Sequence, residues 1–279
     1  MALIVFPFTL LAAARRGPRA LGTNVLLALV LGGLAWAIGR ATHNLAQFAF
    51  VAAGIYAVAT WAGALRRDDA PTFSLTFGSR AFVGATLAYA AVCFLGYTVS
   101  YWAAPYGERT FGLSKVELGW WLGAPAALGG FLGVIIGGWL ADRFHHRHPA
   151  GRLWVPAIAL VLSTPLILIA YTARSVDVFL LCSFLVQGTT SLALGAAAAA
   201  TQSLVAPRMR GTAGAIFLLG PALIGLAFGP FTAGFVSERS GSLGLGVMAT
   251  LGIVPLGLIA LAAAIGSFGE DARRAAAVA

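Results

Sequence analysis

The sequence predicts an all-α bundle of membrane-spanning helices, and three observations lead to that fold class. The 279-residue chain is 59% hydrophobic and only 10% charged, and its mean hydropathy is +0.89, which excludes a soluble globular domain. Its apolar residues form long runs, and inside lipid such runs are helical because an unpaired backbone amide is costly there. Thirty-five glycines allow neighbouring membrane helices to approach closely.

Nine apolar segments divide the chain, and eight of them are candidates to cross a bilayer. About 20 helical residues span the hydrocarbon core, since each residue adds about 1.5 Å. The first segment is too short to span and is interpreted as the end of a helix, and the second is the shortest spanning candidate. The segments lie near residues 1–13, 23–38, 45–65, 80–104, 117–141, 153–173, 177–204, 211–236 and 242–268.

The basic residues support this division, because they concentrate in alternate loops. If the loop after residue 13 is cytoplasmic, the loops on that side hold thirteen of the 18 Lys and Arg residues and the opposite loops hold five. Membrane proteins keep such an excess of basic residues on the cytoplasmic side. The count predicts a cytoplasmic C-terminus. The most polar internal stretch, residues 66–79, is the predicted linker between two bundles.

The segment 117–141 ends in the most informative motif of the chain. Asp142 and Arg143 follow the apolar run directly, and a basic loop comes next. An acid–base pair on the turn that leaves a spanning helix can bond the ends of neighbouring helices where these slide past one another. The motif therefore predicts a gate between conformations. Its alternative interpretation is a charged signal that only sets membrane topology.

Two stretches carry a resemblance to a known family. Gly138, Asp142, Arg143 and Arg147 resemble the cytoplasmic loop signature of the major facilitator superfamily, with His145 in place of the usual glycine. Residues 202–213 (QSLVAPRMRGTA), 223–230 (LIGLAFGP) and 102–106 (WAAPY) are similar to the spinster-like branch.

The resemblance implies a partial major facilitator fold. A family member has twelve helices in two halves, and on that plan residues 1–65 are a remnant of the N-terminal bundle, comprising the end of helix four and helices five and six. Residues 66–79 are then a cytoplasmic linker, 80–268 the C-terminal six-helix bundle and 269–279 a cytoplasmic tail. Helices one to three would be absent, so the chain is expected to be N-terminally truncated.

The resemblance also implies a function. The family suggests a secondary active transporter of the bacterial inner membrane that works by alternating access. The branch suggests a lipid-like or amphipathic small molecule as substrate. The alternative is a truncated, non-transporting membrane fragment or assembly partner.

Polar side chains on two segments are the candidates for a substrate cavity. The polar and aromatic candidates of the 80–104 segment recur every three or four positions, and this spacing places them on one helix face. By resemblance this segment and 177–204 line the central cavity, although bonding between helices would explain the same residues. The candidates are Thr86, Tyr89, Tyr97, Tyr101, Gln187 and Thr190, with Cys93, Ser183 and Ser191 on the same segments.

A further group of residues predicts a bent helix. Pro221, Gly229 and Pro230 fall within the apolar segment 211–236, and proline removes a backbone hydrogen bond and clashes with the preceding turn. The bend is either a hinge or a static shape. The glycines at 129, 133 and 137 predict close packing of the 117–141 helix on a neighbour.

Several functions are not favoured by the sequence. No stripe of basic residues with aromatics predicts nucleic-acid binding, and no His-Glu-x-x-His or Gly-x-Ser-x-Gly pattern predicts an enzyme. His145, His146 and His148 are interpreted as a solvated basic loop facing anionic lipids rather than a metal site. No cofactor is expected. The expected partners are the small-molecule substrate and membrane lipids.

Overall fold

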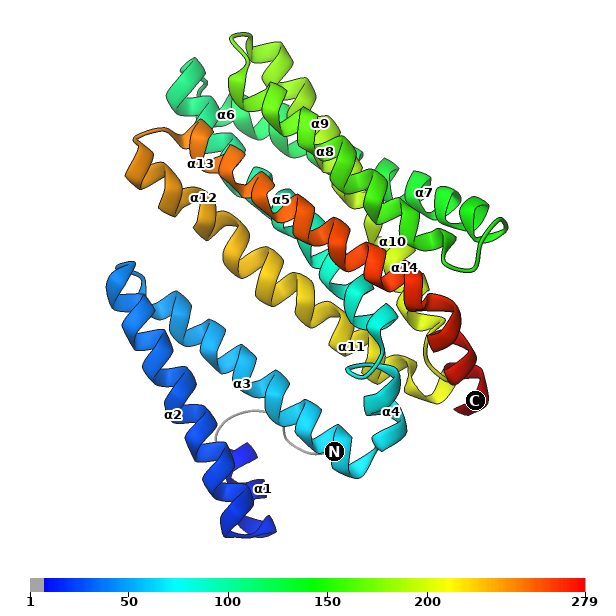
Figure 1. Cartoon of the computed structure of the whole chain (residues 1–279). Helices are drawn as coiled ribbons and strands as arrows, with labels where there is room; N and C mark the ends of the chain where they lie inside the picture. Colours follow the sequence, from blue (N-terminus) through cyan, green and yellow to red (C-terminus); the bar gives the residue numbers. More distant parts are fainter. Residues whose placement is uncertain (1–7, 279) are drawn as a thin grey trace. The chain divides into compact units, whose positions relative to one another are not determined.

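The computed structural model describes residues 8–278, which are almost entirely helical (Figure 1). Eight of the described helical stretches are long and apolar enough to cross a membrane, so the predicted all-α membrane fold is confirmed. The apolar segment predicted at 1–13 is described only from residue 8 onward. The chain divides into two compact units, one ending at Ser74 and the other beginning at Leu75, and this boundary falls within the stretch for which the sequence predicts a linker.

The first unit is built on a helical hairpin. A short helix α1 (Phe8–Arg16) precedes α2 (Pro18–Ala41) and α3 (Leu45–Asp68). The α3 helix begins at Asn44, whose side chain accepts a hydrogen bond from the backbone N–H of Gln47, as N-cap residues commonly do. Arg16 of α1 and Asp68 of α3 form an ion pair of 3.0 Å.

A short helix and the N-terminal cap of the next one occupy the predicted linker. Helix α4 (Ala70–Leu75) leads into α5 (Arg80–Phe111), and Asp69 accepts hydrogen bonds from the backbone and the hydroxyl of Thr72 at the start of α4. The predicted linker is therefore largely helical, because the end of α3, an Asp cap and α4 satisfy most of its backbone groups.

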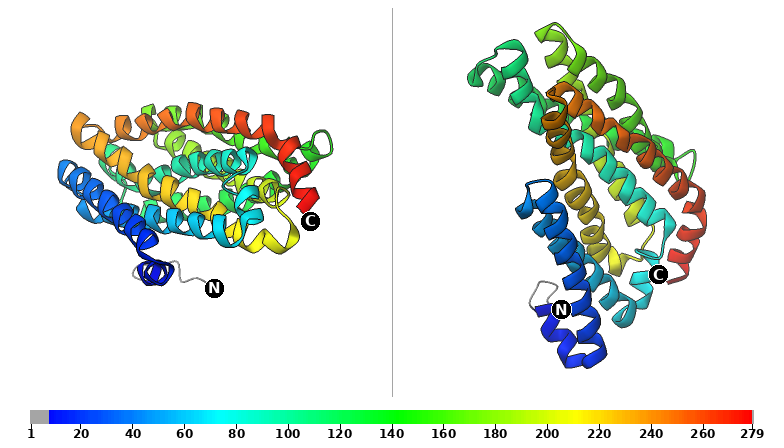
Figure 2. Two further views of the ribbon diagram at one scale, coloured as in Figure 1. Left: turned by 60° about the horizontal axis from the view of Figure 1, so that its bottom comes forward. Right: turned by 60° about the vertical axis from the view of Figure 1, so that its left-hand side comes forward.

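The second unit places α5 at its centre. Both Figure 1 and Figure 2 show α5 lying between α12 and α14, and α5 also contacts α8, α9 and α10. The remaining elements are α6 (Lys115–Leu118), the π-helical turn η1 (Gly119–Gly123), α7 (Ala124–His145), η2 (Gly151–Leu153), α8 (Trp154–Thr172), α9 (Val176–Ser191), α10 (Ala193–Gln202), η3 (Pro207–Met209), α11 (Arg210–Gly220), the π-helical turn η4 (Pro221–Leu226), α12 (Ala227–Ser240), α13 (Leu243–Ala249), η5 (Thr250–Gly252) and α14 (Ile253–Val278).

The composition of α5 explains its central place. Alanines and glycines occupy much of its length, and most of these small residues are buried against neighbouring helices. A side chain added at Gly84 would lie 2.5 Å from a backbone oxygen of α14, and one added at Gly229 of α12 would lie 2.6 Å from the carbonyl oxygen of Phe94. Close approach of this kind is how membrane helices gain packing energy.

An aromatic cluster closes one end of the second unit. The ring of Tyr106 lies against those of Phe111, Tyr171 and Phe179, at centroid distances of 4.7 to 6.1 Å. The Tyr106 hydroxyl donates to the carbonyl oxygen of Tyr171 at 3.0 Å. These rings tie α5, α8 and α9 together, because aromatic pairs add directional contacts to the buried area.

Candidate functional site

The predicted gate motif lies at the end of α7. The ion-pair partner of Asp142 in the structure is Arg152 and not the adjacent Arg143. The Asp142 carboxylate is 3.8 Å from the guanidinium of Arg152, which lies in η2 directly before α8. Arg143 instead lies over the ring of Trp139, with 5.9 Å between its guanidinium carbon and the ring centroid. The motif thus joins the ends of two consecutive helices. The sequence alone does not single out Arg152, because nine residues separate it from Asp142.

The rest of this loop is held by local hydrogen bonds and ring contacts. The Nδ1 atom of His148 accepts the backbone N–H of Ala150 at 3.1 Å, and the imidazole stacks on Trp154. The backbone N–H of Arg147 donates to the carbonyl oxygen of Phe144. In the described part of the chain, no three His, Cys, Asp or Glu side chains gather closely enough to hold a metal ion.

The motif glycine and its neighbours face different surroundings. A side chain added at Gly138 would meet no atom within 4 Å, whereas one added at Gly133 or Gly137 would overlap backbone carbonyl oxygens of α9 or of Leu192. A side-chain carbon added at Gly129 would lie 3.1 Å from atoms of Phe184. The predicted close packing of this helix is therefore confirmed at Gly129, Gly133 and Gly137, which form the contact between α7 and α9.

Three of the cavity candidates are packed inside the second unit. Thr86, Tyr89 and Thr190 are at most 9% exposed. The hydroxyls of Thr86 and Thr190 donate to the carbonyl oxygens of Phe82 and Val186, one helical turn earlier. The Tyr89 ring stacks on Phe217 of α11 at 5.1 Å. Within this unit these side chains hold helices together.

The other three candidates are accessible. Tyr97 and Tyr101 are 38% and 63% exposed and lie one turn apart on α5. Gln187 of α9 accepts a hydrogen bond from the Ser100 hydroxyl through its Oε1 atom at 3.0 Å. This bond joins α5 to α9, which contact each other. Ser100 is therefore a further polar residue at this contact, and the helical spacing of the tyrosines does not point to it.

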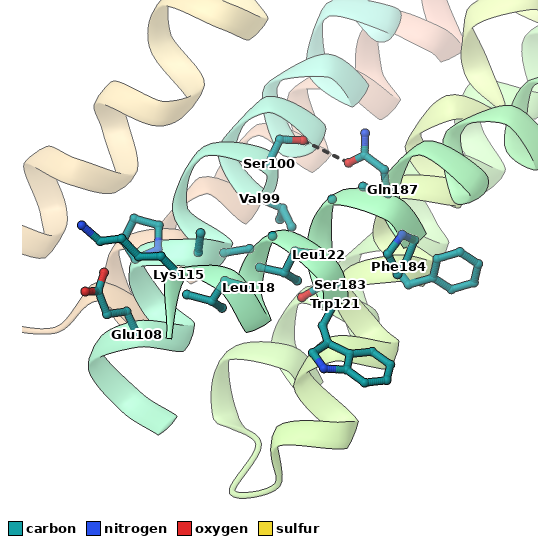
Figure 3. A pocket seen from close by; sticks show the side chains of 17 residues that line it. Val99, Ser100, Glu108, Lys115, Leu118, Trp121, Leu122, Ser183, Phe184 and Gln187 are labelled. Carbon is teal, nitrogen blue, oxygen red and sulfur yellow. Dashed lines mark hydrogen bonds between the residues drawn. The ribbon is translucent and has the colours of Figure 1, made fainter. Parts of the chain in front are cut away.

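Gln187 also lines a pocket of about 540 Å³ inside the second unit (Figure 3). Its walls come from α5, from α6 through the start of α7, and from α9. They are mainly apolar, with Val99, Leu118, Trp121, Leu122 and Phe184 among them, while Ser183 contributes a hydroxyl and Glu108 and Lys115 contribute charges. Of the predicted cavity residues, the structure brings Gln187 and Ser183 into this pocket.

The residues of the predicted bend lie around the π-helical turn η4. Pro221 is the first residue of this turn, and Gly229 and Pro230 lie in α12 just after it. Gly225 approaches Cys93 of α5 so closely that an added side-chain carbon would lie 2.8 Å from the cysteine Cβ. The Trp102 indole donates to the carbonyl oxygen of Pro230 at 2.8 Å. A π-helical turn accommodates the missing proline N–H, and such turns are frequent at functional sites.

One buried acid was not singled out from the sequence. Asp271 of α14 is 4% exposed and accepts hydrogen bonds from the Ser79 hydroxyl at 2.8 Å and from the backbone N–H of Ala81 at 2.9 Å. It caps the start of α5, where the positive end of the helix dipole favours a carboxylate. A polar C-terminal stretch predicts a tail, and only the packing of α14 on α5 shows that its acid is a structural partner.

Comparisons with known proteins agree with the fold. No family model matches the chain. Over 180 residues it is 32% identical to an MFS-type efflux pump of Mycolicibacterium smegmatis, an alignment that covers 64% of this chain and 38% of that protein. The chain thus matches well under half of the length of this relative.

Two solved structures have a similar fold. Both are crystal structures of a bacterial homologue of the human lysosomal transporter Spinster in an inward-facing conformation. The occupied form has a TM-score of 0.61 at 22% identity, and the unoccupied form a TM-score of 0.54 at 20% identity. In each case 88% of this chain and 65% of the solved chain are covered.

Proposed function

We propose that this chain, whose fold is spinster-like, is a member of the major facilitator superfamily and acts in the secondary active transport of an amphipathic small molecule. The observation that supports this most is the combination of eight apolar helices with similarity to an efflux pump and to a transporter fold. Transporters of this kind alternate between conformations by moving one helix bundle against another around a site near the middle of the membrane.

Three accessible side chains are the proposed contacts for the substrate. Tyr97, Tyr101 and Gln187 combine aromatic surfaces with hydroxyl and amide groups, which suits a molecule with an apolar body and a polar end. Thr86, Tyr89 and Thr190 are buried and are proposed to act by holding α5 against its neighbours. Polar and aromatic groups in membrane helices commonly mark the path of a substrate.

The proposed orientation places the α7–α8 loop and the C-terminus in the cytoplasm of a bacterial cell. The excess of basic residues on that side, thirteen of 18 in the loops, supports it. In this orientation the ion pair between Asp142 and Arg152 forms in one conformation of the loop and opens in the other, as a gate requires.

The transport proposal is tested with the gate acid. We expect purified chain in proteoliposomes to move a fluorescently labelled lysolipid, and Asp142→Asn to reduce the initial rate about tenfold while its thermal stability in detergent changes by less than about 1 kcal/mol. The small stability change follows because the side chain of Asp142 is 73% exposed and exposed ion pairs contribute little. Arg152→Gln should have the same effect on transport.

Two results would decide against this proposal. Movement of the lipid no faster than in protein-free liposomes would favour the alternative, a membrane component that does not transport by itself. Transport by the chain that is unaffected by Asp142→Asn would remove the gate from the proposal. Glu270→Gln serves as the control, because Glu270 is an exposed acid paired only with Arg274 of its own helix among the ion pairs described.

The substrate contacts are tested separately. We expect Tyr97→Ala and Tyr101→Ala each to raise the substrate concentration for half-maximal transport about fivefold to tenfold, because an aromatic contact contributes about 0.5–1.5 kcal/mol. Tyr89→Phe is the matched control: it removes only the hydroxyl of a stacked and buried ring, so its half-maximal concentration should not change. Equal effects at Tyr89 and Tyr97 would show that the exposed tyrosines have no special contact.

A further inference from the structure

The pocket lined by α5, α6–α7 and α9 has features of a built site in addition to its volume. About 540 Å³ falls in the range of pockets that hold small organic ligands. All of its lining residues belong to the second unit, so the pocket exists without any contribution from the first. Ligand binding to this pocket therefore requires no movement of one helix bundle against the other.

Ser183 is the most informative residue in this pocket. Its side chain is 5% exposed, and its hydroxyl oxygen is buried without a hydrogen-bond partner among the described residues. A buried hydroxyl without a partner destabilises the folded chain. Two threonines of α9 avoid this cost, since the hydroxyls of Thr189 and Thr190 donate to the carbonyl oxygen of Val186. Ser183 lines the pocket (Figure 3), from which a ligand can supply the missing partner.

The charges around the pocket indicate an uncharged ligand. Glu108 and Lys115, both exposed, carry opposite charges at its edge, so they give no net preference for an anion or a cation. The other polar side chains that line the pocket are neutral, namely those of Ser183, Ser100 and Gln187. A charged group placed there would lose its hydration without an opposite charge to compensate.

The wall formed by α6 and the start of α7 is irregular. It contains the π-helical turn η1, with Trp121 and Leu122 on the turn and Gly119 and Gly123 at its ends. No atom lies within 4 Å of a side chain added at either glycine. Pro125 follows the turn and has no N–H to donate to it, so the hydrogen bonding of this wall is already irregular. Trp121, which is 60% exposed, offers an aromatic face to a flat ligand.

From these features we infer that the pocket is a binding site for a neutral amphiphile that has a flat apolar body and one hydroxyl group, with Ser183 as its hydrogen-bond partner. The apolar body lies against Trp121, Leu122 and Phe184. The hydroxyl reaches Ser183, and the amide of Gln187, fixed by Ser100, provides a second polar contact. Because Gln187 is also one of the proposed substrate contacts, this inference rests on and deepens the proposed function, while binding to the pocket can be measured without transport.

The test uses a thiol reporter in the pocket and a matched reporter outside it. In the full chain carrying Cys93→Ala and Cys182→Ala, a cysteine is introduced by Ala126→Cys, which lines the pocket, or by Ala127→Cys, which does not. The rate of reaction with N-ethylmaleimide is measured in detergent, with 1-naphthol or with naphthalene, which lacks the hydroxyl. We expect 1-naphthol to slow the reaction of Ala126→Cys at least about fivefold and to leave Ala127→Cys unchanged.

The hydroxyl group provides the specific part of the test. Naphthalene should need about ten times the concentration of 1-naphthol for equal protection, since a hydrogen bond to an otherwise unpaired group contributes about 1.4 kcal/mol or more. Adding Ser183→Ala should reduce this difference to less than twofold. The same reporter at Ala104, on the α5 wall of the pocket, replaces Ala126→Cys if that variant does not fold.

Three outcomes would overturn the inference. Equal protection of Ala126→Cys and Ala127→Cys would mean that the probe only partitions into the micelle. Equal protection by both probes with Ser183 intact would mean that the pocket accepts any apolar chain, such as a lipid tail. No reaction at either pocket reporter would mean that the pocket is closed to small molecules. A failed transport assay would leave all of these measurements interpretable, because they report binding only.

Discussion

Replacing Asp271 with alanine is expected to destabilise the second unit by about 3 kcal/mol. The substitution leaves the Ser79 hydroxyl and the Ala81 N–H buried without their acceptor, since both residues are at most 3% exposed. Each such unpaired group costs about 1–3 kcal/mol. The substitution also removes the negative charge that stabilises the N-terminal end of the α5 dipole. In a unit of this size the melting temperature should fall by roughly 6–12 °C.

The neighbouring acid provides the control for this prediction. Glu270→Ala removes an exposed carboxylate whose ion pair is formed with Arg274 four residues later, so its melting temperature should change by no more than about 2 °C. Asp271→Asn keeps an acceptor for the Ser79 hydroxyl and should lie between the two. Identical melting curves for Asp271→Ala and Glu270→Ala, measured by tryptophan fluorescence in detergent, would contradict a capping role for Asp271.

The second large effect is expected at adjacent glycines of α7. Gly137→Ala should destabilise the unit by about 1–3 kcal/mol, because the added carbon overlaps the carbonyl oxygen of Leu192 and the two helices have to separate. Gly138→Ala should be neutral or stabilise by up to about 1 kcal/mol, because its surroundings are open and alanine is the better helix former.

This pair separates packing from any role of the motif in gating. The family pattern points to Gly138, whereas the tight contact within the second unit belongs to Gly137. The two variants differ by one position on the same helix, so detergent, expression level and composition are matched. Melting temperatures that fall equally for both, or only for Gly138→Ala, would show that α7 does not pack on α9 as described.

Much of the fold could be predicted from the sequence because hydropathy acts over long segments. The spans from α2 to α14 follow from runs of apolar residues, since lipid allows hardly any other structure for them. The irregular places were harder to predict. One apolar run at 177–204 contains the break at Leu192 between α9 and α10, and the stretch from 66 to 79 is polar enough to read as a linker although α4 occupies part of it.

The candidate site could be predicted only in part, for a related reason. Helical spacing places Thr86, Tyr89, Tyr97 and Tyr101 on a common face, but it does not show what each position faces along the helix. Thr86 and Tyr89 contact α11, whereas Tyr97 and Tyr101 lie farther along α5 and remain accessible. Spacing is local, and the partner of a side chain is decided by the helix that packs beside it.

By itself, the sequence determined that this protein is a bundle of membrane helices, and its motifs indicated the major facilitator type, because composition and short signatures do not depend on which helices touch. Only the tertiary structure decided the partners: Arg152 for Asp142, Ser79 and Ala81 for Asp271, and a pocket wall for Ser183. The paired residues lie between ten and 192 positions apart, and only the packing of helices brings such distant groups within bonding distance.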